Sequence, residues 1–381
     1  MQEIIIGPNQ AGQRLDKFLH KYLPNATSSF LYKMLRKKNI TLNGKKAEGK
    51  EMLSVGDVVQ SYFSEETFAK FSGGAGNGLV GDGVHEPPAP KAAHDTADYT
   101  PHKVMAFARQ YQEAYRSLKG ISVLYEDEQK LLLNKPAGIL TQKAKDADLS
   151  LNEWMIGYLL ENGSITEDEL ATFKPSVCNR LDRNTSGIVI CGKTLAGSQH
   201  LSEWIRTRAL SKFYRTVCVG EIKESALMEG FLWKDTRTNK VTISGKNVKA
   251  AELAPTGADF IRTAYTPLAA NGKYTLLEVE LITGKTHQIR AHLASIGHPL
   301  MGDFKYGNPH INRDMKTRFG LEHQLLHAYR VVFPDGMEVT APYPEQFARI
   351  VNELIGDQNH GNLEFQRSSG LHPGKPDQPD Q

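Results

Sequence analysis

The residue in this sequence whose surroundings most favour chemistry is Asp182. It stands between Arg180 and Arg183, and the small and polar residues of the segment 185–187 that follow it are typical of a turn. Nearby guanidinium charge favours the ionised form of the carboxylate. An ionised aspartate presented on a loop can act as a nucleophile or a base at the anomeric region of a sugar. The same pattern also fits a surface ion pair in a turn, so the residues alone leave both interpretations open.

Two further residues could take part in such chemistry. Tyr214 lies in a β-favouring run that begins at Lys212. Its ring could be a packing residue or could stack on an extruded base, with its hydroxyl available for proton transfer. Arg290 lies in the segment TGKTHQIRAH, residues 283–292, which fits either the start of a helix or an edge strand. Arg290 could accordingly pair with a carboxylate, anchor a phosphate or be a plain surface charge.

Spacing argues against two other kinds of site. The run Gly284 to Thr286 resembles the end of a phosphate-binding P-loop, but Val279 stands where that motif needs its first glycine. The three cysteines do not have zinc-ligand spacing and are expected to be reduced packing residues. A last group also matches no standard pattern of metal ligands: His287, His292, His298 and Asp303. We therefore expect no metal.

A small basic module precedes these segments. Residues 1–63 hold ten Lys and Arg against five Asp and Glu, which leaves 36 against 38 in the rest of the chain. Apolar residues at helical spacing predict a helix over 13–23 and a second helix capped within 27–29. Asn43-Gly44 predicts a hairpin turn between two short strands. The second helix has basic residues on one face, which are candidates for phosphate contacts: Lys33, Arg36 and Lys37.

Composition divides the remainder of the chain. Residues 64–102 are rich in glycine and proline and have little apolar surface to offset the entropy lost on ordering, so we expect a flexible linker. A connecting helix is expected over 103–118, and a disordered tail over 356–381. Between them, residues 119–355 combine many short β-favouring runs with a few helical patterns, without strict alternation. This favours an α+β catalytic domain with a mixed, largely antiparallel sheet.

These segments resemble a known family of enzymes. The sequences RLDRNTSG around Asp182 and TGKTHQIRAHLASIGHPLMGD over 283–303 are similar to motifs of the pseudouridine synthases that modify large-subunit ribosomal RNA and some transfer RNAs. This resemblance spans about residues 120–350. The segments RLDKFL and LYKMLRKKNITLNGKKA, within about 12–63, resemble the small α/β RNA-binding domain of small-subunit ribosomal protein four. The order of the two domains also matches the family.

The resemblance implies a pseudouridine synthase fold that isomerises uridine to pseudouridine in a structured RNA, with large-subunit ribosomal RNA as the expected substrate. It implies no cofactor and no metal. It makes Asp182 the catalytic aspartate, Tyr214 the tyrosine that contacts the target base, and Arg290 the basic residue that pairs with the aspartate. Leu326 resembles an apolar residue that packs near the base, and Arg180 is a further candidate for contact with RNA.

The sequence departs from the family at two positions. Asn179 stands where members commonly have a histidine, and Asn184 where a second aspartate is often found. Two rival functions stay open: a non-catalytic RNA-binding factor in ribosome assembly, and a hydrolase that cleaves an N-glycosidic bond. We expect a cytoplasmic protein, because the sequence shows no signal peptide and no run of about eighteen apolar residues that could span a membrane. We also expect a monomer.

Overall fold

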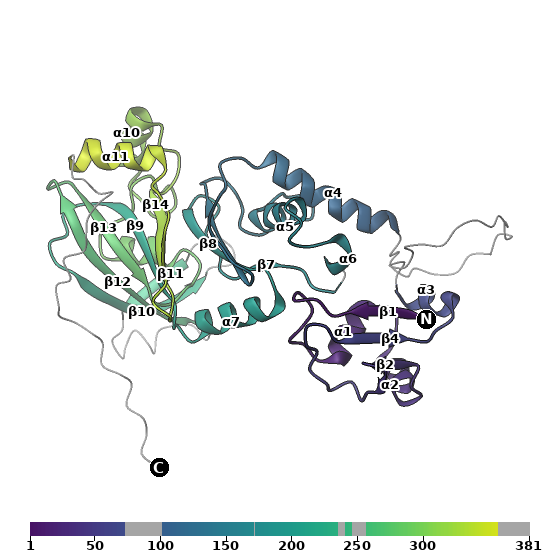
Figure 1. The fold of residues 1–381 in the computed structure, drawn as a ribbon. Coiled ribbons are helices and arrows are strands. Elements are labelled where there is room, and N and C mark those ends of the chain that lie inside the picture. The colour runs from purple at the N-terminus through teal and green to yellow at the C-terminus, as the bar shows by residue number, and fades with distance from the viewer. Residues whose placement is uncertain (73–100, 171, 235–240, 246–256, 357–381) are drawn as a thin grey trace, which may run out of the picture.

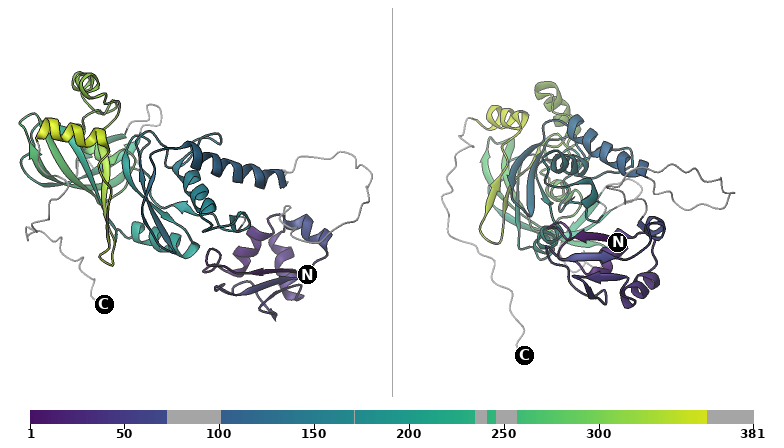
Figure 2. Two further views of the ribbon diagram at one scale, coloured as in Figure 1. Left: turned by 45° about the horizontal axis from the view of Figure 1, so that its top comes forward. Right: turned by 45° about the vertical axis from the view of Figure 1, so that its right-hand side comes forward.

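The structure is a computed structural model that describes residues 1–72, 101–170, 172–234, 241–245 and 257–356 (Figure 1). It has a small N-terminal domain and a larger catalytic domain built on one long sheet (Figures 1 and 2). The two domains contact each other through polar side chains. Asn9 Nδ2 donates to Glu169 Oε1 at 3.0 Å, and Gln10 Nε2 donates to Thr172 Oγ1 at 3.0 Å.

The N-terminal domain packs helices on a four-stranded antiparallel sheet with the strand order β1-β4-β2-β3. Phe18, Leu31 and Ile40 are among the residues of its apolar core. Its elements are β1 (Gln2–Ile5), α1 (Leu15–Tyr22), α2 (Ser28–Arg36), β2 (Ile40–Leu42), β3 (Lys45–Lys46), β4 (Val58–Ser61) and α3 (Glu65–Ser72).

Two local predictions for this domain are confirmed. Thr27 caps α2, because its Oγ1 accepts a hydrogen bond from the backbone N–H of Phe30 at 3.3 Å. Asn43 and Gly44 both have positive φ, 51° and 71°, in the turn between β2 and β3. A two-residue hairpin turn of this kind requires such values at both central positions.

The expected boundary at residue 63 and the start of the expected linker over 64–102 are wrong. The segment that follows β4 forms α3, which completes the N-terminal domain. Phe68 is buried in the core of this domain, and the ring of Phe71 lies 4.3 Å from that of Phe30. Two aromatic side chains at helical spacing thus stabilise a segment that looks polar by composition. Residues 73–100 lie outside the described residues.

The helix expected to connect the domains over 103–118 is observed as α4 (Pro101–Ser117). It packs on α5 as part of the catalytic domain, where Tyr111 and Ala114 are buried in the largest apolar core. The catalytic fold therefore includes this helix, which is a correction to the expected start at residue 119. Of the expected tail over 356–381, Gly356 follows the last helix and the rest lies outside the described residues.

The catalytic domain is built on an eleven-stranded sheet whose main path is β11-β10-β12-β13-β9-β14-β8-β6-β5, with β15 beside β14 and β7 beside β8. Its strands are β5 (Ser122–Glu126), β6 (Lys130–Lys135), β7 (Ser176–Val177), β8 (Ser186–Gly192), β9 (Ser211–Val219), β10 (Ala226–Lys234), β11 (Val241–Gly245), β12 (Asp259–Ala270), β13 (Tyr274–Leu281), β14 (Leu326–Val332) and β15 (Glu338–Thr340). Among the described pairs, β14 with β8 is parallel and the others are antiparallel. The expected α+β class with a mixed, largely antiparallel sheet is confirmed.

Helices cover each half of this sheet separately (Figures 1 and 2). The first half, with β6 and β8, shares its core with α4 and α5. In the second half, Val217 and Leu276 pack with residues of α10 and α11. The helices after α4 are α5 (Leu151–Glu161), α6 (Glu167–Leu170), α7 (Leu195–Arg206), α9 (Gln288–Ser295), α10 (Pro309–Phe319) and α11 (Glu345–Ile355). Over the described parts of the chain, no helix has the length and apolar character to cross a membrane.

The two halves of the sheet meet where β8 runs parallel to β14. Ser186 and Gly187 pair with His327 and Ala328, and the Ser186 hydroxyl lies 2.9 Å from His327 Nδ1. Gly187 has a φ of 108°, and a Cβ atom placed on it would lie 2.2 Å from the Ala328 carbonyl oxygen. Only glycine allows the two strands to approach this closely. Because the Asp182 loop leads directly into β8, this junction fixes where the loop lies.

Replacement of Gly187 by alanine should therefore destabilise the fold through both backbone strain and overlap with β14. We expect a loss of roughly 3 kcal/mol or more in the free energy of unfolding, measured by urea denaturation. Gly163→Ala is the matched control, because Gly163 also has a positive φ of 72° but open space around the position of a Cβ. It should lose only about 1 kcal/mol. Equal losses in the two variants would contradict the close approach of the two strands.

Candidate active site

Asp182 lies on the loop between β7 and β8, and a buried lysine holds this loop. Lys135 Nζ donates to the carbonyl oxygens of Pro136 and Arg183 at 3.0 Å and of Ile139 at 2.9 Å. The three donors of its ammonium group are thus matched by three backbone acceptors. Burial lowers the pKa of Lys135 to about 7, although the negative charge of Asp182 opposes this shift. Lys135 therefore joins the end of β6 to the Asp182 loop.

A threonine fixes the residue before the aspartate. Thr141 Oγ1 donates to the carbonyl oxygen of Leu181 at 2.8 Å and accepts from the N–H of Leu181 at 3.1 Å. The loop then closes on itself, because the N–H of Thr185 donates to the carbonyl oxygen of Asp182 at 3.0 Å. The backbone on both sides of Asp182 is thus hydrogen-bonded, which restricts the directions in which its side chain can point.

The carboxylate of Asp182 is held by an arginine that is held in turn by a second aspartate. Arg290 Nη1 donates to Asp182 Oδ2 at 2.9 Å. Its Nε and Nη2 donate to Asp303 Oδ2 and Oδ1 at 2.7 and 2.9 Å, which is the bidentate geometry of a strong guanidinium–carboxylate pair. Burial would lower the pKa of Arg290, but the hydrogen bonds and charge of Asp303 outweigh burial and raise it. Arg290 is therefore a fixed cation, and one of its remaining N–H groups binds Asp182.

Asp303 is fully buried and belongs to a tight turn. Its Oδ1 also accepts from the backbone N–H groups of Lys305 and Tyr306 at 2.9 and 3.1 Å. Burial alone would raise the pKa of Asp303, but the hydrogen bonds from Arg290 lead to a net lowering. From the sequence, Asp303 was considered only as a possible metal ligand. In the structure, it is the residue that orients Arg290.

His287 is a further neighbour of Asp182, with Nε2 at 3.8 Å from Asp182 Oδ2. Its Nδ1 lies 3.0 Å from the hydroxyl of Tyr306, which itself accepts from the N–H of Val241 at 3.0 Å. The Tyr306 hydroxyl can then donate its proton to Nδ1, which leaves the imidazole proton on Nε2, on the side of Asp182. Burial lowers the pKa of His287, so the neutral ring is favoured. A second N–H group thus faces the Asp182 carboxylate.

Tyr214 and Leu326 complete the immediate surroundings of Asp182. Tyr214 lies on β9 and Leu326 begins β14, and both are buried. With Asp182, Arg180 and Arg290 they line a small pocket of about 50 Å³. Burial, reinforced by the negative charge of Asp182, raises the pKa of the Tyr214 hydroxyl. The neutral phenol is therefore strongly favoured at neutral pH.

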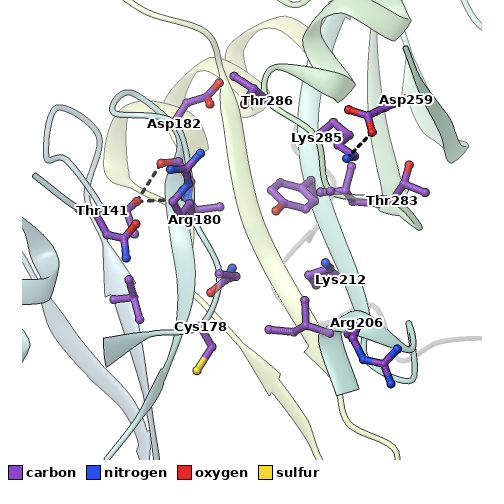
Figure 3. A pocket seen from close by; sticks show the side chains of 18 of the residues that line it. Thr141, Cys178, Arg180, Asp182, Arg206, Lys212, Asp259, Thr283, Lys285 and Thr286 are labelled. Atoms are coloured by element: carbon purple, nitrogen blue, oxygen red, sulfur yellow. Dashed lines mark hydrogen bonds and ion pairs between the residues drawn. The ribbon is translucent and has the colours of Figure 1, made fainter. Parts of the chain in front are cut away.

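The small pocket adjoins a larger cleft of about 1060 Å³, which also reaches Asp182 and Tyr214 (Figure 3). One wall includes Thr141, Cys178 and Arg180, from the segments before and within the Asp182 loop. The facing wall comes from α7, β9, β12 and the segment after β13. It contains Arg206, Lys212, Asp259, Thr283 and Lys285. A cleft of this size that is lined by several cations can accommodate a nucleotide with its phosphates.

The structure thus brings together five of the residues that the sequence selected: Asp182, Tyr214, Arg290, Arg180 and Leu326. The other three lie elsewhere, exposed on α2 and at its C-terminal cap in the N-terminal domain: Lys33, Arg36 and Lys37. The guanidinium that contacts Asp182 is that of Arg290, whereas the neighbouring Arg183 donates through Nε to the carbonyl oxygen of Gly138 at 2.9 Å. The segment around Arg290 is the start of α9, which settles the choice between helix and strand.

The residues once weighed as metal ligands have separate partners. Asp303 binds Arg290, while His292 Nδ1 lies 3.0 Å from Thr263 Oγ1 and His298 Nδ1 lies 2.9 Å from the carbonyl oxygen of Val219. Within the described ranges, no group of three or more His, Cys, Asp or Glu side chains could hold a metal ion.

Comparison with known proteins agrees with this fold and site. A family model described as RNA pseudouridylate synthase matches residues 129–295, and one described as S4 domain matches residues 13–59. A human structure, RNA Pseudouridylate Synthase Domain Containing 4, has the same fold with a TM-score of 0.53. It is 21% identical in sequence, and the match covers 65% of this chain and 97% of that one.

Two curated relatives extend over nearly the whole chain, and both are named ribosomal large subunit pseudouridine synthase C. The relative from Vibrio vulnificus (strain CMCP6) is 26% identical over 93% of this chain and 96% of its own length. The relative from Escherichia coli (strain K12) is 26% identical over 92% of this chain and 96% of its own length. Residues 129–295 of this chain are thus similar to the RNA pseudouridylate synthase family, and its N-terminal segment is similar to the S4 domain. Together with the names of the two relatives, these matches indicate that the chain is an isomerase.

The contact between Arg290 and Asp303 leads to a prediction for Asp303→Asn. The amide would turn a donor toward Arg290 and leave its charge without a buried partner, which costs about 3 kcal/mol or more of stability. We expect turnover to fall by about 100-fold or more. RNA affinity should change less than about threefold, because Asp303 is buried and can affect bound RNA only through Arg290. Steady-state kinetics, RNA binding and urea denaturation measure the three effects.

Asp314→Asn serves as the matched control for this variant. Asp314 on α10 pairs with Arg318 at 3.6 Å, but both side chains are more than 40% exposed, and neither lines the cleft. Loss of an exposed pair should cost less than about 1 kcal/mol and leave turnover nearly unchanged. If the two variants behaved alike in turnover, Asp303 would have no special role in orienting the site.

Proposed function

We propose that this enzyme isomerises specific uridines to pseudouridine in structured RNA, with large-subunit ribosomal RNA as its substrate. The observation that carries the proposal is the Asp182–Arg290–Asp303 chain at the base of a cation-lined cleft. The match to the family model supports the reaction, and the names of the two relatives support the choice of RNA. The protein would thus act in ribosome biogenesis.

The target atoms of a uridine inside an RNA stack are inaccessible, so the nucleotide must first be flipped out. The cleft beside Asp182 and Tyr214 has the room for such a nucleotide. In this proposal the ring of Tyr214 stacks on the uracil, and Leu326 packs against it from the start of β14. Arg180, which lines both the cleft and the small pocket, contacts the RNA.

The reaction breaks the bond between the sugar carbon C1′ and uracil N1, rotates the base, and forms a bond from C1′ to C5. The C5 proton leaves and N1 gains a proton, so the composition of the RNA is unchanged. Asp182 either attacks C1′ or removes the neighbouring sugar proton, because a carboxylate can act as a nucleophile or as a base. Arg290 holds the carboxylate in position through its hydrogen bond. The raised pKa of Tyr214 favours stacking by a neutral ring over action as an ionised base.

The S4 domain is proposed to contribute affinity for RNA. Lys33, Arg36 and Lys37 are exposed on one face of α2, and among the described residues none of them forms an ion pair. Their charges are thus free to neutralise phosphates. We also propose a cytoplasmic monomer.

Asp182→Asn tests the catalytic assignment. The amide keeps the shape of the side chain but can neither attack the sugar nor accept its proton, so product should fall below detection while RNA affinity changes less than about threefold. Pseudouridine is read out as a mass-neutral change that stops reverse transcription after carbodiimide treatment. Substantial turnover by this variant would remove Asp182 from the mechanism.

The same assay separates the rival functions. Release of free uracil by the wild-type protein would indicate a hydrolase. RNA binding without any product, by an otherwise folded wild-type protein on large-subunit ribosomal RNA, would favour a non-catalytic assembly factor or a different substrate RNA.

The basic face of α2 is tested by replacing Lys33, Arg36 and Lys37 together with glutamine. Loss of three phosphate contacts should reduce the slope of log affinity against log salt concentration by about 2 to 3. The turnover number at saturating RNA should stay within about twofold, because these residues lie outside the catalytic cleft.

The matched control is a triple glutamine replacement on α10 at Arg313, Lys316 and Arg318. These cations are also exposed on a helix, but Lys316 and Arg318 already pair with acidic side chains. Their replacement should leave the salt slope unchanged. Equal slopes for the two triple variants would show that the face of α2 does not bind phosphate.

A further inference from the structure

Lys212 lies on the wall of the cleft opposite the Asp182 loop (Figure 3). It precedes Tyr214 by two positions on β9, so both side chains lie on the same face of the sheet, about 7 Å apart along the strand. A Cβ atom placed on Gly284 would lie 3.7 Å from Lys212 Nζ. The ammonium group therefore sits beside the Thr283–Lys285 turn, at the side of the cleft.

Lys212 has no partner among the described residues, whereas two other cations of the cleft are paired. Lys285 pairs with Asp259 at 2.6 Å, and Arg206 Nε donates to Glu203 Oε2 at 2.8 Å. No carboxylate of the described residues lies within 4.0 Å of Lys212 Nζ, and no hydrogen bond occupies it there. Arg180 and Arg208 are likewise unpaired but are exposed to water, whereas Lys212 is only partly exposed.

An unpaired charge that is shielded from water costs stability unless another group compensates it. Burial lowers the pKa of Lys212, and within the described part of the chain no acidic group opposes that shift. A side chain of this kind weakens the free protein and gains its partner only when an anion enters the cleft. Residues that reduce stability in this way are typical of functional sites.

We propose that Lys212 is a phosphate-binding residue that holds the backbone of the RNA strand at the target nucleotide. This assignment rests on the proposed function. The base of that nucleotide stacks on Tyr214, and the phosphodiester beside it lies within reach of the ammonium group two residues earlier on the same strand face. The bound phosphate supplies the negative charge that no carboxylate of the described residues provides beside Lys212. Lys212 acts on binding and positioning, while the bond changes are left to Asp182.

The test compares Lys212→Met with Lys273→Met. Methionine keeps the length of the chain and removes only the charge, and Lys273 lies in the exposed turn between β12 and β13, outside the cleft. The probe is an unmodified transcript of large-subunit ribosomal RNA. Lys212→Met should raise KM about tenfold or more and leave kcat within about twofold, since a charge-assisted contact present throughout the reaction is lost. Lys273→Met should change neither.

Binding is measured separately in the Asp182→Asn background, where no turnover occurs. There, Lys212→Met should lower the salt slope of log affinity by about 0.7 to 0.9, the value of one phosphate contact. Lys212→Arg should restore most of that slope, because it restores the charge. The melting temperature of Lys212→Met should stay level or rise, since the variant removes an uncompensated charge. If Lys212 had only a structural role, its replacement by methionine should lower the melting temperature.

Two outcomes would overturn the assignment: an unchanged salt slope and KM in Lys212→Met, or a fall in melting temperature that accounts for its loss of affinity. Failure of the proposed function is seen independently, because it appears as an absence of pseudouridine in the transcript treated with wild-type enzyme. The slope measured with Asp182→Asn does not depend on product.

Discussion

The contact on which the rest of the site depends is the fork of Arg290 between two aspartates. Asp303 takes two of its nitrogens and Asp182 takes a third. Asp303 is fully buried, so the guanidinium cannot turn away from it without leaving an unpaired charge inside the protein. The position of the Asp182 carboxylate therefore follows from the position of Asp303, although 121 positions separate these residues in the chain.

The fold brings three distant segments to this fork. The parallel contact of β8 with β14 fixes the exit of the Asp182 loop, and Gly187 makes that contact possible. Lys135, at the end of β6, binds the residue after Asp182, and Thr141, in the segment beyond β6, binds the residue before it. The first turn of α9 presents Arg290 from the other half of the sheet. The site thus lies where the two halves of the sheet meet, and each half supplies part of it.

The sequence predicted much of this arrangement because several signals are local. Thr27 and the Asn43-Gly44 turn act within a few residues, and the strands at 131–133 and 188–190 are short apolar runs that the structure bears out. Asp182, Tyr214 and Arg290 were selected through motifs, and the structure places them around one pocket.

The missed features depend on contacts across the fold. Asp303 could not be recognised as the partner of Arg290, because the pairing depends on how a turn folds back on α9. The role of Lys135 depends on carbonyl groups that no side-chain pattern reveals. Helix α3 was missed because its polar composition conceals Phe68 and Phe71, which are stabilised only by the core they enter.

The most direct test of the central claim is a structure of the wild-type enzyme bound to a hairpin of large-subunit ribosomal RNA that contains its target uridine. The proposed mechanism predicts that the uridine is flipped into the cleft, with its C1′ or the adjacent sugar carbon within about 3.5 Å of the Asp182 carboxylate. It also predicts that Arg290 still bridges Asp182 and Asp303. A complex with the target uridine outside the cleft, or with Arg290 turned away from Asp182 onto the RNA, would contradict it.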